Sequence, residues 1–175
     1  MAGLYSRINP DNYEVEYALA FAGTYFECSN RGVASAMEDI LQLGGISEDM
    51  NLAISVGTDL VEKYGSQEIT MVGHSKGGAE AVGASLATGR NAKTYNPAKV
   101  NATKLGKKGN PSIINFIVKG EILSQLDIGG EINGNRIEVN YIGEIRYLET
   151  SENLNFLQKH SIDTIIEILK DNKYK

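Results

Sequence analysis

The sequence predicts an α/β protein with a mixed sheet, an N-terminal hairpin and helices on both faces. Strand-like apolar segments alternate with helix-like segments along most of the chain, which is typical of this fold class. Residues 3–8 and 13–21 are strand-like and flank Asn9-Pro10-Asp11-Asn12, a strong turn cluster, which predicts the hairpin. We expect one domain over residues 1–175, because a chain of this length can bury a core without disulfides or metal.

Two helices are predicted between the hairpin and the centre of the chain. Residues 32–43 have a helical pattern that stops at Gly44-Gly45. A longer helix follows Ser47, a suitable N-cap, and ends at Gly65. Its apolar residues recur with helical spacing, so we expect this helix to cover the sheet.

The later part of the chain continues the alternation. Its expected elements are a strand at 68–72, a tight turn at 73–77, a helix through about residue 88, strands at 92–95 and 112–118, a turn at 130–135, strands at 136–141 and 144–148, and an amphipathic helix at 161–170.

Composition excludes several classes of function. With 22 acidic and 17 basic residues the net charge is −5, which argues against a nucleic-acid partner held by phosphate contacts. Cys28 is the only cysteine and the chain has two histidines, so we expect no metal site and no cofactor. The N-terminus lacks a signal-peptide pattern and no apolar stretch is long enough for a membrane span. These features predict a soluble protein, either cytoplasmic or exported as an effector by another route.

The strongest motif is Gly73-His74-Ser75-Lys76-Gly77, a GxSxG pattern. An apolar strand leads into it and a helix of small residues follows, as a nucleophile elbow requires. The turn holds the serine at a strained backbone position, and glycines two residues before and after avoid a clash between Cβ atoms. This context predicts Ser75 as the nucleophile of an α/β-hydrolase.

A serine nucleophile needs a general base and an acid that orients it. His74 is adjacent to Ser75 at the turn, where neighbouring side chains cannot easily face each other, which leaves His160 as the base. Glu121 directly follows an apolar strand and is the favoured acid, because such folds place their sites after parallel strands. Asp127 is the alternative acid.

The oxyanion hole needs two hydrogen-bond donors. One is expected to be the backbone N–H of Lys76, the residue after the nucleophile. The segment AFAGTYFE follows an earlier strand and offers Gly23 and Thr24 for the second donor, and Thr24 could give both its backbone N–H and its hydroxyl. The Lys76 side chain is expected to face solvent, with contact to an anionic headgroup as the alternative.

Four blocks resemble the class 3 lipases, and most closely the compact lipase-like domains of bacterial effector and toxin proteins. They are YALAFAGT, ITMVGHSKGGAEA, NFIVKGEILSQL and HSIDTI. In such lipases the acid falls where Glu121 stands and the oxyanion-turn residue falls on Thr24, although the acid is usually Asp and the residue at Lys76 is usually Leu.

The resemblance implies hydrolysis of acyl esters, commonly lipids or phospholipids, through an acyl-enzyme on Ser75. It also implies transient contact with a membrane surface, and it is compatible with a larger parent protein or an immunity-type partner. Two alternatives stay open from the residues: a hydrolase of amides or thioesters, and a non-catalytic binding domain that retains the fold.

Overall fold

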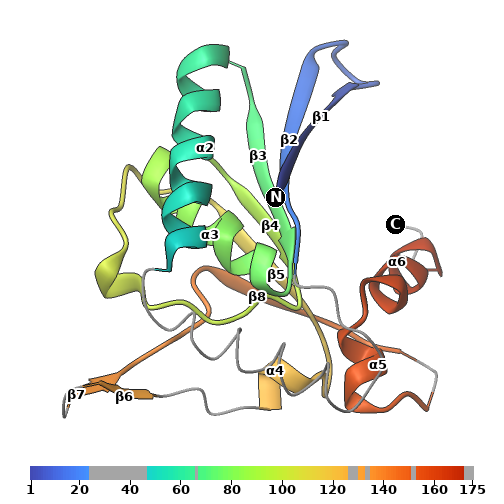
Figure 1. The fold of residues 1–175 in the computed structure, drawn as a ribbon. Coiled ribbons are helices and arrows are strands. Elements are labelled where there is room, and N and C mark those ends of the chain that lie inside the picture. Colours follow the sequence, from blue (N-terminus) through green and yellow to red (C-terminus); the bar gives the residue numbers. More distant parts are fainter. Residues whose placement is uncertain (24–46, 66, 126–129, 133–134, 151–152, 172–175) are drawn as a thin grey trace.

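The computed structural model describes residues 1–23, 47–65, 67–125, 130–132, 135–150 and 153–171. Figure 1 shows a mixed six-stranded sheet with helices packed on it, so the predicted fold class is confirmed. The expected helix at 32–43, Thr24 and Asp127 lie outside the described residues.

The chain begins with the predicted hairpin. Strands β1 (Ala2–Ile8) and β2 (Val15–Phe21) pair in antiparallel register, with Ala2 opposite Phe21. In the turn between them, the Asn9 side chain accepts a hydrogen bond from the Asp11 backbone N–H at 2.9 Å. The second strand starts later than expected because Tyr13 has a φ of 61°, which extended backbone does not allow.

The rest of the sheet is parallel. Its order is β1-β2-β3-β4-β5-β8. The added strands are β3 (Ile69–His74), β4 (Ala92–Tyr95), β5 (Ile113–Val118) and β8 (Glu144–Leu148). Because these strands run in one direction, their carboxyl ends meet at one edge of the sheet, which carries the candidate site.

Two long helices cover one face of the sheet. Helix α2 (Glu48–Tyr64) is capped by Ser47, whose side chain accepts from the Met50 backbone N–H, and α3 (Lys76–Thr88) follows β3. The strand order advances in one direction from β2 to β4, and right-handed crossovers then put both helices on the same side. Small residues bring α3 close, since a Cβ on Gly83 would lie 2.3 Å from the Met50 sulfur.

The opposite face is covered by the C-terminal helix. Ile165 and Ile168 of α6 (Ile162–Asp171) pack against Val118, which points away from the α3 side of β5. The predictions for α2, α3 and this last helix are confirmed to within two residues at each end. Between β8 and α6 lies a short helix, α5 (Phe156–His160), which the sequence did not predict.

Short elements account for the other differences from the sequence prediction. The expected turn at 130–135 contains a strand, β6 (Gly130–Ile132), which pairs with β7 (Asn135–Ile137), and the strand expected at 136–141 ends with β7. The helices η1 (Ala102–Lys104) and α4 (Ile122–Gln125) have too few residues for a hydrophobic period to reveal them.

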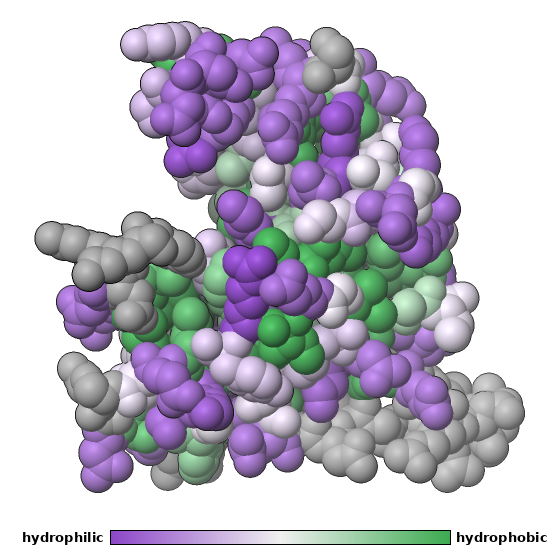
Figure 2. All heavy atoms as spheres, turned by 180° about the vertical axis from the view of Figure 1, so that it is seen from behind, coloured by the Kyte–Doolittle hydropathy of each residue, from purple (hydrophilic) through white to green (hydrophobic). Residues whose placement is uncertain are grey.

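Helix α6 leaves part of its face of the sheet open. Figure 2, which views the molecule from behind, shows hydrophobic residues gathered near the middle of that view, with hydrophilic residues around them. A cavity of about 550 Å³ lies on the α6 face of the sheet, and Ala18, Thr70, Val72 and Ile114 are among the residues that line it. The one-directional winding explains the opening, because neither crossover helix can reach this side.

No helix within the described ranges is both long enough and apolar enough to cross a membrane.

Candidate active site

Ser75 lies on the turn between β3 and α3, as the motif predicts. Its φ of 56° and ψ of −123° are unusual for a residue with a Cβ, and such strained positions cluster at functional sites. The Ser75 carbonyl accepts from the backbone N–H of Gly78 and of Ala98, which holds the turn in place. The serine hydroxyl is thereby fixed at the carboxyl edge of the sheet, at the N-terminus of α3.

The motif glycines are required by close backbone contacts. A Cβ on Gly73 would lie 2.0 Å from the Gly77 carbonyl oxygen, and one on Gly77 would lie 2.2 Å from the Phe21 carbonyl oxygen. The expected crowding between the two glycines is therefore present. Gly77 additionally lets α3 begin directly against the end of β2.

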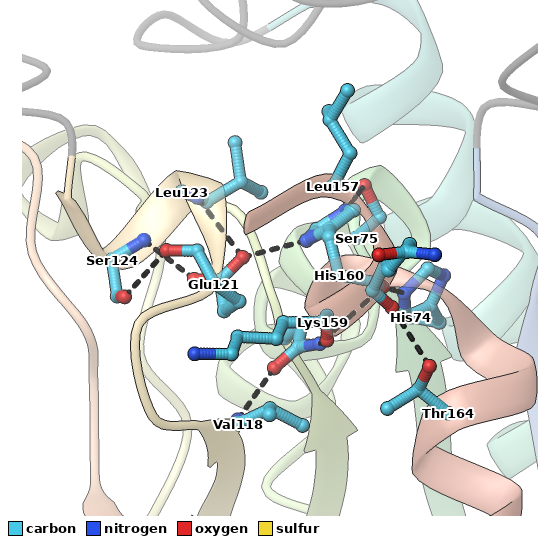
Figure 3. A network of polar contacts seen from close by, with 12 residues as sticks. His74, Ser75, Val118, Glu121, Leu123, Ser124, Leu157, Lys159, His160 and Thr164 are labelled. Atoms are coloured by element: carbon cyan, nitrogen blue, oxygen red, sulfur yellow. Dashed lines mark hydrogen bonds and ion pairs between the residues drawn. The ribbon is translucent and has the colours of Figure 1, made fainter. Parts of the chain in front are cut away.

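His160, 85 residues downstream, reaches Ser75 from the end of α5. The distance from His160 Nε2 to Ser75 Oγ is 2.9 Å, and the two side chains are almost entirely buried. Figure 3 shows the imidazole between the serine and the carboxylate of Glu121.

Glu121 contacts the other nitrogen of that ring. Its Oε2 lies 2.6 Å from His160 Nδ1 and also accepts from the Leu123 backbone N–H, while Oε1 accepts from the Ser124 backbone N–H. A carboxylate only accepts hydrogen bonds, so His160 carries its proton on Nδ1 and presents the lone pair of Nε2 to the serine. The structure brings Ser75, His160 and Glu121 into one hydrogen-bonded chain.

The Lys76 side chain is not the solvent-facing group expected from the sequence. Its ammonium pairs with Asp49 in the first turn of α2, and its side chain is only 21% exposed. The ion pair joins the N-termini of α2 and α3, and it lowers the pKa of Asp49 through a hydrogen bond from Lys76. The backbone N–H of Lys76 belongs to the first turn of α3, where such groups lack an intrahelical acceptor.

The sequence did not assign two further side chains that lie at the site. His74, set aside as a base, has its ring centroid 5.0 Å from that of His160, and its Nε2 lies 2.7 Å from the His160 carbonyl oxygen. Burial and the neighbouring His160 lower the pKa of His74 to about 4, so it is neutral at neutral pH.

Asn96 is the second of these side chains. It follows β4 and also contacts the His160 carbonyl oxygen. An asparagine directly before a proline reads as an ordinary turn, so no sequence signal distinguished it.

The cavity on the α6 face of the sheet is separate from the candidate site, because Ser75, His160 and Glu121 are not among the residues that line it. Within the described ranges, no group of three or more His, Cys, Asp and Glu side chains is placed to hold a metal ion.

The sheet, the strained turn and the buried polar chain define an α/β-hydrolase-like architecture. The family described as phospholipase-like, the Tle-like phospholipase domain, matches residues 2–169. The chain belongs to this family, whose description supports hydrolysis of lipid esters at the family level. No curated protein matches the sequence.

Proposed function

We propose that the protein is a serine-dependent phospholipase in which Ser75 is the nucleophile, His160 the general base and Glu121 the orienting acid. The observation that carries this proposal is the buried chain from Glu121 through His160 to Ser75, with distances of 2.6 and 2.9 Å. Hydrogen-bond reach between nucleophile, base and orienting group is the geometric requirement for this chemistry.

The reaction begins when Ser75 Oγ attacks the ester carbonyl carbon and His160 Nε2 takes the hydroxyl proton. The C–O bond to the leaving alcohol then breaks, and the imidazolium gives its proton to that alcohol oxygen. The same imidazole then deprotonates water, which attacks the acyl carbon. The bond from that carbon to Ser75 Oγ breaks, Oγ takes the proton back from the imidazolium, and a fatty acid leaves. Glu121 stabilises the positive charge that forms on His160 in both halves of the reaction.

The negative charge on the carbonyl oxygen needs donors at the N-terminus of α3. The backbone N–H of Lys76 is the proposed first donor, favoured by the helix dipole. The second is proposed to come from Thr24, as the class 3 lipase resemblance implies. A phospholipid substrate resides in a membrane, so the proposal includes transient contact with a lipid surface.

The proposal is tested with vesicles of phosphatidylethanolamine and phosphatidylglycerol, by measuring fatty-acid release. The native protein should release fatty acid and react covalently with a fluorophosphonate, while Ser75→Ala and His160→Ala should lose both activities. Thermal unfolding of each variant serves as the control for folding.

Three results would count against the proposal. Undiminished release by Ser75→Ala would exclude this serine as the nucleophile. Release without fluorophosphonate labelling would favour a different mechanism. A folded native protein that neither hydrolyses the vesicles nor reacts with the probe would favour a binding domain.

A further inference from the structure

His160 lies at the end of a short helix, where helical hydrogen bonds no longer hold its carbonyl. It is the last residue of α5, and Ser161 has extended backbone with a ψ of 141° before α6 begins. Carbonyl groups in the last turn of a helix have no intrahelical donor. The position of the imidazole therefore depends on what holds the His160 carbonyl.

Two side chains donate hydrogen bonds to that one oxygen: the partly buried His74 at the end of β3 and the buried Asn96 directly after β4. The His74 Nε2–H donates at 2.7 Å and the Asn96 Nδ2–H at 3.3 Å. Asn96 also donates to the Lys159 carbonyl at 2.9 Å. Since a carbonyl oxygen only accepts, His74 must carry its proton on Nε2.

The orientation of the Asn96 amide is fixed by a third contact. Its Oδ1 accepts from the Val118 backbone N–H at 2.8 Å, so its nitrogen must face α5. The side chain is fully buried, its φ is 41°, and its own backbone N–H donates to the Phe116 carbonyl. Asn96 thus ties the carboxyl ends of β4 and β5 to the end of α5.

His74 ties the same oxygen to the strand that carries the nucleophile. It is the last residue of β3 and directly precedes Ser75. Figure 3 shows His74 beside the His160 main chain, whereas Glu121 reaches the His160 ring. The two sets of contacts are separate: Glu121 orients the imidazole, and the donors from β3 and β4 hold the backbone that carries it.

We propose that His74 and Asn96 are positioning residues that hold the His160 carbonyl and thereby set the distance from the imidazole to Ser75 Oγ. This inference rests on the proposed function, because it assigns a role in delivering the proposed base. A neutral His74 suits the role, since a second positive ring would repel the imidazolium that forms on His160 during turnover.

The sharpest test compares two amides at position 74. The amide nitrogen of glutamine can reach the place of His74 Nε2, whereas that of asparagine can reach only the place of Nδ1. We expect His74→Gln to lose less than about fivefold in kcat and His74→Asn to lose about 10- to 100-fold, because displacement by about 1 Å can cost 100-fold. KM for vesicle phospholipid and the midpoint of thermal unfolding should be similar in the two variants.

Asn96→Asp provides an independent second variant. It keeps the acceptor for the Val118 N–H and removes the donor to the His160 carbonyl, so we expect a loss of about 100-fold in kcat and in the rate of fluorophosphonate labelling. Thr94→Val is the matched control. It removes a buried hydrogen bond of 2.7 Å from Thr94, a residue of β4, to Asn115. Its thermal midpoint should fall while its kcat stays within about twofold of the native value.

The inference is overturned if His74→Asn and His74→Gln have equal kcat, or if Thr94→Val loses as much activity as Asn96→Asp. Either result would leave these side chains a structural role only. If Asn96→Asp fails to fold, the comparison at position 74 still decides. Failure of the proposed function is separable, because it appears in other proteins: as undiminished activity in Ser75→Ala, or as a native protein that neither hydrolyses the vesicles nor reacts with the fluorophosphonate.

Discussion

Glu121 and His160 form a buried contact between two segments that are 39 residues apart in the sequence. The distance from Glu121 Oε2 to His160 Nδ1 is 2.6 Å, and the side chains are 0% and 3% exposed. Two backbone N–H groups at the start of α4 hold the carboxylate in place. A charged group at such depth requires partners of this kind, because an unpaired buried carboxylate is strongly destabilising.

Replacement of the acid is the first prediction. Glu121→Gln keeps the side-chain length but no longer fixes the proton of His160 on Nδ1, so we expect kcat to fall by about 10³- to 10⁴-fold. The sequence left Asp127 as the alternative acid, and Asp127→Asn is the matched control. It should retain activity on phospholipid vesicles. Loss of activity in Asp127→Asn alone would assign the acid to that residue.

The elbow glycine gives a prediction about stability. A Cβ on Gly73 would lie 2.0 Å from a backbone carbonyl oxygen, and a Cβ cannot rotate away. We expect Gly73→Ala to lower the free energy of unfolding by about 3 kcal/mol or more, as overpacking against backbone does. Urea unfolding measures the effect.

Gly106→Ala is the control for that experiment, because a Cβ there would have nothing within 4 Å. Its free energy of unfolding should stay within about 0.5 kcal/mol of the native value. Equal stability of the two variants would mean that the turn relaxes more freely than its contacts indicate.

Residues whose role depends on local pattern could be predicted from the sequence. The strand before Ser75, the small residues after it and the N-cap at Ser47 each leave a signal within a few positions. His160 was reached by elimination, because only two histidines exist. Glu121 was favoured from its place after an apolar strand, and the structure puts it beside His160.

Residues whose role depends on side chains meeting across the fold could not be predicted in this way. Asn96 contacts α5 from 63 residues away, and nothing in its neighbourhood indicates that distance. Lys76 was expected to face solvent because its partner, Asp49, lies 27 residues earlier, on another helix. The first contact depends on where α5 lies beside the end of β4, and the second on the packing of α2 against α3. A single sequence does not encode either as a local pattern.

The ion pair between Lys76 and Asp49 is expected to contribute little to the stability of the protein. Asp49 is 57% exposed, so solvent screens the pair, and exposed ion pairs contribute about 0.2–1 kcal/mol. A double-mutant cycle with Lys76→Met and Asp49→Asn should give a coupling energy in that range, and 1 M NaCl should reduce it. A coupling well above 1 kcal/mol that persists in salt would show that the pair is effectively buried.

Because His74 is neutral in the folded protein, we expect the free energy of unfolding to depend on pH in the acid range. Its pKa is about 4 in the folded protein, below the ordinary value of 6.5, because burial and His160 disfavour its charged form. Between these pH values the unfolded chain binds the proton and the folded protein does not, so the free energy of unfolding rises with pH. The stabilising contribution is complete above pH 6.5 and is lost as pH falls through 4.

Comparison of native protein with His74→Gln isolates this contribution. The lowered pKa of His74 corresponds to about 3 kcal/mol of folding free energy. Between pH 6.5 and 4 the free energy of unfolding of the native protein should therefore fall by that much more than that of the variant, as urea unfolding measures.

Glu80 gives a control of opposite sign, because burial raises its pKa and its contribution to stability is lost as pH rises. Glu80→Gln should therefore steepen the rise of stability with pH, where His74→Gln flattens it. Parallel curves for native protein and His74→Gln would mean that His74 binds its proton equally well in the folded and unfolded states, against the burial that the structure shows.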